Sequence, residues 1–79
     1  MVVDDSNTIR RSAEIFLKQG GHEVLLAEDG FDALVKVNDF RPHLIFCDIL
    51  MPKLDGYQTC AIIKRNAHFA DTPVVMLSS

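Results

Sequence analysis

Short apolar runs alternate with longer segments of mixed polarity along the 79-residue chain. A short apolar run bounded by polar or turn-forming residues is typical of a β-strand, so four such runs predict four strands. In the mixed segments apolar residues recur every three or four positions, which is the spacing of one helix face. The predicted strands are 1–3, 22–27, 44–47 and 74–77.

Three helices are predicted between these strands, each with recognisable ends. Ser6 is a candidate N-cap of the first helix, which ends at Gly20–Gly21. Asp29 is a candidate cap of the second, which closes at Arg41 because the residue before a proline avoids the helical region. The third helix covers about 56–66. The expected apolar faces are Ile9, Ala13, Phe16 and Leu17 in the first helix, Ala33, Leu34 and Val37 in the second, and the inward-pointing Tyr57, Cys60 and Ile63 in the third.

The order of the elements predicts the fold class. Strands that alternate with helices at this spacing favour a parallel sheet with crossover helices, which is a doubly wound α/β fold. The run 44–47 contains no polar residue, as expected for a strand that is covered on both faces. In such sheets ligands bind beyond the carboxyl ends of the strands, so functional residues are expected there.

Composition narrows the partner classes. The net charge of −3 and a pI near 5.4 disfavour nucleic acid and anionic membranes as partners, because both attract a basic surface. The pair Arg10–Arg11 is too small to change this and is interpreted as a solvated helix face. No apolar run approaches the roughly 20 residues of a membrane helix, and no signal peptide opens the chain, so we expect a cytoplasmic protein.

The cysteines and histidines show no pattern of a metal site. Cys47 and Cys60 lie in apolar contexts, so we interpret them as small buried residues in a reducing compartment rather than as a disulfide or metal pair. The histidines lie at element boundaries and are interpreted as surface or boundary residues: His22, His43 and His68.

Acidic residues follow the predicted strands at the edge where a ligand is expected. Asp4 and Asp5 come after the first strand, Asp48 after the third, and Ser78 after the fourth. Three carboxylates at one edge repel one another, and a divalent cation relieves this. Oxygen ligands alone favour Mg²⁺, and a carboxylate beside Mg²⁺ can act as a nucleophile toward phosphorus. Acidic residues at strand ends are also commonly plain loop residues or helix caps, and Asp5 fits a cap alone.

Four stretches together resemble the receiver domains of two-component response regulators, the CheY-like family. They are Val-Val-Asp-Asp-Ser at 2–6, Glu-Asp-Gly at 28–30, Asp-Ile-Leu-Met-Pro at 48–52 followed by Asp55–Gly56, and Pro-Val-Val-Met-Leu-Ser at 73–78. Each stretch is short, but their order on an alternating β/α chain is specific, and they span the whole of 1–79. The resemblance implies a flavodoxin-like receiver fold.

The resemblance also implies roles for particular residues. Asp48 matches the phosphoacceptor, which receives its phosphoryl group from a histidine kinase. Asp4 and Asp5 match the acidic pair that holds Mg²⁺. Leu50 matches the position that lends its backbone carbonyl to the metal, and Ser78 matches the switch hydroxyl residue. Pro52 and Gly56 match loop-shaping positions. Such a domain is not a conventional enzyme; it catalyses only its own phosphorylation and dephosphorylation and signals by contact with a downstream protein.

A narrower resemblance concerns segments outside this chemistry. Thr-Ile-Arg-Arg at 8–11, Asp-Gly-Phe-Asp-Ala-Leu at 29–34, 55–64 and Met-Leu-Ser-Ser at 76–79 are similar to stand-alone regulators of twitching-motility chemosensory systems. Those regulators act with type IV pili, so the resemblance implies a role in pilus motility.

The family pattern has five strands and five helices, and this chain supplies about four strands and three helices. We therefore expect residues 1–79 to be a C-terminally truncated, partial receiver domain that lacks the fifth strand and the last two helices. The family's phosphoryl-contacting lysine has no counterpart, and Lys53, in the loop after Asp48, is expected to face solvent. Strand 74–77 becomes an exposed edge, which favours a dimer through strand pairing.

Two other functions stay open from the residues. A phosphatase or phosphotransferase that uses a strand-end aspartate often has a second acid two positions later, and Leu50 occupies that position here. A receiver-like binding module that is not phosphorylated, or an inactive fragment, remains the alternative because the lysine is missing. Phosphorylation of Asp48 by acetyl phosphate distinguishes these readings.

Overall fold

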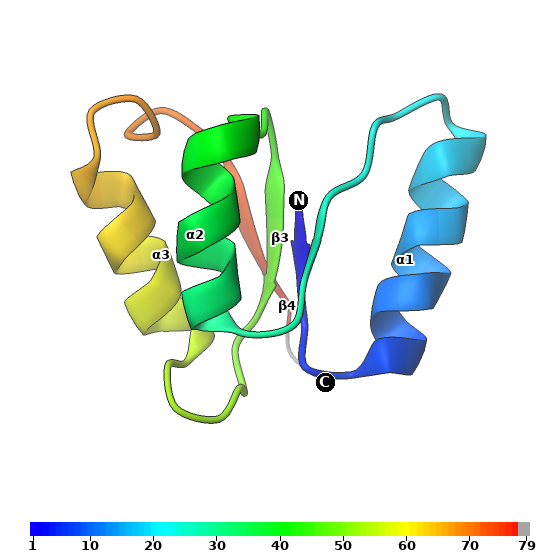
Figure 1. Cartoon of the computed structure of the whole chain (residues 1–79), viewed down its shortest axis with the longest axis horizontal. Helices are drawn as coiled ribbons and strands as arrows, with labels where there is room; N and C mark the ends of the chain where they lie inside the picture. The colour runs from blue at the N-terminus through cyan, green and yellow to red at the C-terminus, as the bar shows by residue number, and fades with distance from the viewer. Residues whose placement is uncertain (78–79) are drawn as a thin grey trace.

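The computed structural model describes residues 1–77 as four strands and three helices in strict alternation (Figure 1). The sequence therefore predicted the number and order of the elements correctly. Their bounds are β1 Val2–Val3, α1 Asn7–Gln19, β2 Leu26–Ala27, α2 Gly30–Phe40, β3 Ile45–Asp48, α3 Gly56–Arg65 and β4 Val74–Leu77.

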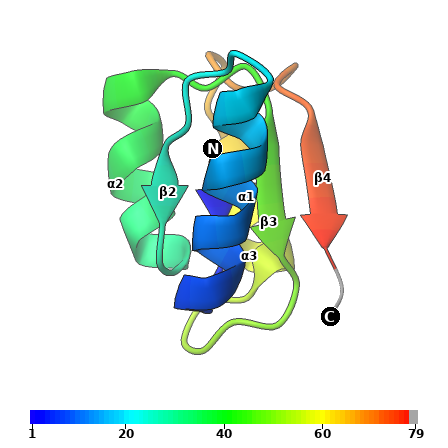
Figure 2. The same ribbon diagram turned by 90° about the vertical axis from the view of Figure 1, so that its right-hand side faces the viewer.

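All the strands pair in parallel, in the order β2-β1-β3-β4. Val3 of β1 lies beside Ala27 of β2 and Cys47 of β3, so the carboxyl ends of these three strands are level. Figure 2 shows β4 at one border of the sheet and β2 at the other. This arrangement is the predicted doubly wound α/β sheet, and it brings the strand ends that carry the acidic residues to one edge.

The helices cover the two faces of the sheet unequally. Helices α2 and α3 lie on one face and α1 on the other (Figure 1). No residue of α1 is fully buried, and Phe16 is 79% exposed, while Ala13 and Leu17 are half-buried. Phe46 of β3 is likewise only half-buried on its strand, so the expected cover of β3 on both faces is met in part.

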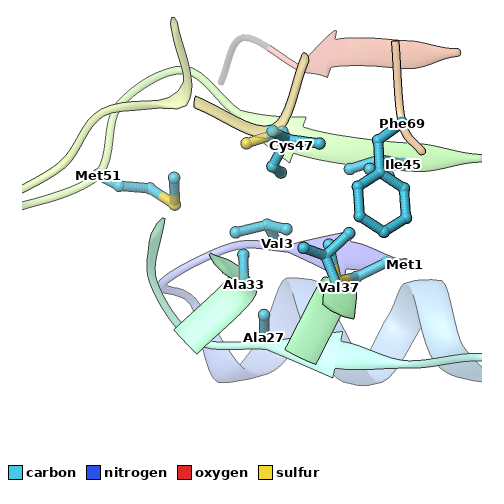
Figure 3. Packing of buried hydrophobic residues seen from close by; sticks show 10 residues of the cluster. Met1, Val3, Ala27, Ala33, Val37, Ile45, Cys47, Met51 and Phe69 are labelled. Carbon is cyan, nitrogen blue, oxygen red and sulfur yellow. The ribbon is translucent and has the colours of Figure 1, made fainter. Parts of the chain in front are cut away.

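The hydrophobic core lies between the sheet and the α2–α3 layer. Figure 3 shows side chains of β1 and β3 facing those of α2. Phe69, from the segment after α3, closes the cluster at its far end. The buried members are Met1, Val3, Ala27, Ala33, Val37, Ile45, Cys47, Met51, Ile63 and Phe69.

The helix ends follow the predicted caps. Ser6 Oγ accepts the Ile9 N–H at 3.3 Å, and Asp29 Oδ1 accepts the Asp32 N–H at 2.7 Å. Arg41 ends α2 in the left-handed region, with φ 46°. Each cap satisfies a backbone group that has no partner within its helix, which fixes where the helix starts or stops. None of the helices described within residues 1–77 has the length and apolar character needed to span a membrane.

Several details differ from the sequence prediction, and one is that β3 covers Ile45–Asp48 rather than 44–47. Strand β2 covers Leu26–Ala27 rather than 22–27, because its ladder partner β1 offers only two residues. Tyr57 was predicted to point inward and is 62% exposed. Thr59 is completely buried instead, on a helix that begins at a capping box formed by Asp55.

Candidate functional site

Three carboxylates converge at the carboxyl ends of β1 and β3. Asp4 and Asp5 directly follow β1, and Asp48 is the last residue of β3. Because β1 and β3 are neighbours in register, the ends of the two strands lie side by side. One carboxylate oxygen from each residue lies within 4.8 Å of the others. The structure thus brings together the three acidic residues that the sequence nominated.

Asp4 is held on three sides. Its side chain is buried, and its Oδ1 accepts the Ser6 N–H at 2.8 Å. Its own N–H donates to the Ala27 carbonyl at 3.1 Å, which continues the ladder between β1 and β2. Its carbonyl accepts a hydrogen bond of 2.5 Å from Arg10 Nη1. The turn after β1 is therefore fixed both to the sheet and to α1.

Electrostatics at Asp4 favour a bound cation. Burial raises the pKa of the Asp4 carboxyl above its ordinary value, and the negative charges of Asp48 and Asp5 raise it further. The Ser6 N–H and the Arg10 charge act in the opposite direction but do not cancel the rise in this pKa. A divalent cation among the three carboxylates removes the repulsion, so the cluster has the charge and the oxygen ligands of a Mg²⁺ site.

Asp48 is tightly packed between the end of β3 and the start of α3. Its side chain is 7% exposed, and its Oδ1 accepts the Leu50 N–H at 3.2 Å. Its carbonyl oxygen would lie 2.2 Å from a Cβ placed on Gly56, so only glycine fits at the start of α3. The Leu50 side chain is 69% exposed, which agrees with a position where only the backbone is expected to matter.

The prediction that both cysteines are buried is confirmed for Cys47 and met only in part for Cys60. Cys47 is buried and Cys60 half-buried, and both are free thiols. Burial raises the pKa of the Cys47 thiol to about 12, with a smaller contribution from Cys60. The thiol beside Asp48 is therefore neutral at physiological pH and serves as an apolar neighbour rather than as a nucleophile.

The outcome differs among the other residues that the sequence singled out. Lys53 is exposed, as expected, with φ 69° in the loop after β3. Ser78 lies outside the described residues, so its predicted role stays a prediction. The histidines are all exposed, as predicted: His22, His43 and His68.

The sequence interpretation of Arg10 was wrong. Arg10 and Arg11 were both interpreted as part of a solvated helix face, but only Arg11 is exposed, in an ion pair of 3.0 Å with Glu14. Arg10 is half-buried and reaches the Asp4 carbonyl. Its position one turn after the Ser6 cap was the available signal, because that spacing directs a long side chain back over the first turn of the helix.

Comparison with known proteins decides the family. The profile described as "Response regulator receiver domain" matches residues 1–79. The chain belongs to this family. It is 63% identical over its full length to Protein PilG of Pseudomonas aeruginosa, and it covers 58% of that protein.

Solved receiver structures agree with this assignment. Chemotaxis protein CheY4 of Vibrio cholerae superposes with a TM-score of 0.93 at 33% identity, over 95% of this chain and 62% of that one. The receiver domain of NtrX from Brucella abortus gives a TM-score of 0.87 at 39% identity, over the same shares of the two chains. The receiver chain thus spans about three fifths of the length of these relatives.

Membership of the family establishes the general class of function. The chain is a signalling receiver domain of the kind found in two-component and chemotaxis response regulators, not a conventional enzyme. Receiver domains bind Mg²⁺ through acidic residues, and Asp4, Asp5 and Asp48 form an acidic cluster of that kind.

Proposed function

We propose that the protein accepts a phosphoryl group on Asp48 from a histidine kinase in a Mg²⁺-dependent reaction. The observation that carries this proposal is the burial of Asp48 at the end of β3, with its carboxylate oxygen within 4.8 Å of those of Asp4 and Asp5. A carboxylate held in this way is fixed in direction, as a nucleophile needs to be.

The roles of the remaining residues follow from their positions. Asp4 and Asp5 would hold Mg²⁺ together with Asp48, and Leu50 would contribute its backbone carbonyl. Bound there, Mg²⁺ would neutralise negative charge on the carboxylates and on the incoming phosphoryl group. Ser78, the residue after β4, would donate its hydroxyl to a phosphoryl oxygen. The oxygen-only set of donors supports this assignment, since hard divalent cations prefer such ligands.

The chemistry at Asp48 is a simple displacement. A carboxylate oxygen of Asp48 forms a bond to phosphorus while the P–N bond of the kinase phosphohistidine breaks, and the electron pair leaves with the imidazole nitrogen. The product is an acyl phosphate. Water then attacks this phosphorus, the P–O bond to Asp48 breaks, and the carboxylate is regenerated with release of inorganic phosphate.

Acetyl phosphate tests the proposal without a cognate kinase. The protein, expressed from its natural reading frame, is incubated with acetyl phosphate and MgCl₂ and analysed by intact-mass spectrometry. We expect a mass gain of one phosphoryl group that EDTA abolishes. Asp48→Asn removes the nucleophile and should abolish the gain, whereas Asp39→Asn, an exposed carboxylate on α2, is the matched control and should retain it.

The same assay distinguishes the proposal from the alternative of a receiver-like binding module that is not phosphorylated. A correctly folded wild-type protein that gains no mass at saturating MgCl₂ supports a module that acts by contact alone. A gain that persists in Asp48→Asn would place the phosphoryl group on another residue and would also contradict the proposal. Circular dichroism on the same samples establishes that the protein is folded.

We further propose that the signalling pathway is a chemosensory one that controls type IV pilus motility, in the cytoplasm. The identity of 63% to Protein PilG, together with the segments 8–11, 29–34 and 55–64, supports this narrower assignment. A chimera tests it: the aligned segment of PilG is replaced by this chain in a Pseudomonas aeruginosa strain that lacks PilG. We expect the chimera to restore twitching.

Two controls accompany the chimera. The same chimera with Asp48→Asn should fail to restore twitching. A chimera that carries the corresponding segment of the ycf27 regulator of Galdieria sulphuraria, which is 39% identical to this chain, should also fail. Restoration by the ycf27 segment would show that any receiver suffices, and the assignment to pilus motility would lose its support.

A further inference from the structure

Arg10 bridges α1 and the acidic turn through an uncharged acceptor. Its Nη1 donates to the Asp4 carbonyl at 2.5 Å, and its Nη2 lies 3.4 Å from Asn7 Oδ1. The guanidinium thus contacts the backbone of a proposed cation ligand rather than its carboxylate. Arg11, the next residue, is exposed and pairs with Glu14 on the outer side of α1. Two adjacent arginines therefore lie in different environments.

The contact from Arg10 completes the restraint of the turn 4–6. The Asp4 N–H is bonded to β2 and its carboxylate to the Ser6 N–H, but neither bond fixes the peptide plane between Asp4 and Asp5. The hydrogen bond from Arg10 to the Asp4 carbonyl fixes that plane. Asp5 is exposed, so its orientation depends on this plane.

We propose that Arg10 is a positioning residue for the cation site. It sets the orientation of Asp4 and Asp5 toward the point where Mg²⁺ would lie between them and Asp48. The proposal rests on the cation site of the proposed function. Partners that orient metal ligands commonly change metal affinity by about 10–100-fold when they are removed, although they do not touch the ion.

The sign of the effect distinguishes positioning from simple charge. A positive charge near a cation site repels the cation, so removing a guanidinium that acts only through its charge should tighten Mg²⁺ binding. Removing one that orients the ligands should weaken Mg²⁺ binding. The hydrogen bond from Arg10 goes to a neutral carbonyl. We therefore expect the loss of ligand orientation to outweigh the loss of charge repulsion, so that Mg²⁺ binding weakens.

Isothermal titration with MgCl₂ measures this directly, without reference to phosphorylation. Arg10→Met keeps the length of the side chain but removes the donor, and it should weaken Mg²⁺ binding by about tenfold. Arg11→Met is the matched control, with the same change of charge one position along the helix, and its affinity should stay within about twofold of wild type. Arg10→Lys keeps the charge but loses the planar fork, so we expect an intermediate affinity.

Each outcome has a defined meaning. A wild-type protein that binds no Mg²⁺ contradicts the cation site of the proposed function itself. If the wild type binds Mg²⁺ and Arg10→Met binds it equally or more tightly, the positioning role of Arg10 is wrong while the site stands. Thermal melts accompany every titration; if Arg10→Met does not fold, Arg10→Lys decides, and an affinity equal to wild type overturns the role.

Discussion

Gly56 provides a quantitative test of the packing around Asp48. A Cβ at this position would lie 2.2 Å from the Asp48 carbonyl oxygen and 2.9 Å from its carbonyl carbon. Both obstacles are backbone atoms of a strand that is paired on its two sides, so they cannot move aside as a flexible side chain does. Gly56→Ala must therefore displace α3 from the end of β3.

The magnitude follows from two opposing effects. Inserting a methyl group into a filled site costs about 1–3 kcal/mol, and the backbone obstacles place this case at the upper end. Alanine in a helix recovers up to about 1 kcal/mol relative to glycine. We expect a net loss of about 2 kcal/mol in the free energy of unfolding, a large share of the roughly 4–12 kcal/mol of a domain of this size. The Gly56 N–H bond to the Ile49 carbonyl, 3.1 Å long, should weaken as well.

Urea denaturation followed by circular dichroism measures this loss. With an m value of about 1 kcal/mol per molar urea, the midpoint should fall by about 2 M. Gly20→Ala is the matched control, because Gly20 has φ −80° and its nearest neighbour is the flexible His22 ring at 3.2 Å. We expect this control to change the free energy of unfolding by less than about 0.5 kcal/mol.

The result that refutes the reasoning is a Gly56→Ala protein as stable as wild type. It would mean that α3 moves away from β3 at no cost and that Asp48 is not held by the packing described above. A destabilised Gly56→Ala protein should also be phosphorylated more slowly by acetyl phosphate at temperatures where it stays folded, because the carboxylate shifts with its backbone.

Two further predictions concern charge and helix caps. Asp4→Asn should be more stable than wild type at pH 7 in EDTA. Because the pKa of Asp4 is raised above 3.8 in the folded protein, the wild type loses stability as the pH rises from 3.8 through that pKa. In pH-dependent melts the advantage of Asp4→Asn should therefore vanish below pH 3.8. Asp55→Ala, which breaks a capping box, should lower the free energy of unfolding by about 1–2 kcal/mol, as measured by urea denaturation. Ser6→Ala, which removes a longer hydrogen bond, should lower it by only about 0.5 kcal/mol.

The sequence predicted the features that depend on local chemistry and element order. Caps at Ser6 and Asp29 were predictable because the side chain satisfies a backbone group three residues away. The site was predictable because parallel strands bring their carboxyl ends together whatever their exact length. The length of β2 and the buried face of α3 were not, since the first depends on the ladder partner and the second on how α3 packs against α2 and β3.

Arg10 shows where reasoning from a single sequence stops at this site. Asp4, Asp5 and Asp48 carry carboxylates wherever they lie, so a cluster of carboxylates could be inferred from their positions after the strands. The role of an arginine depends on its acceptor, and that acceptor is a backbone carbonyl which every residue possesses. Because every residue carries such an acceptor, the spacing of Arg10 from the Ser6 cap is the only signal in the sequence, and this spacing does not identify the carbonyl that Arg10 binds. Only the path of the chain between β1 and α1 separates the arginine that holds the acidic turn from the one that faces solvent.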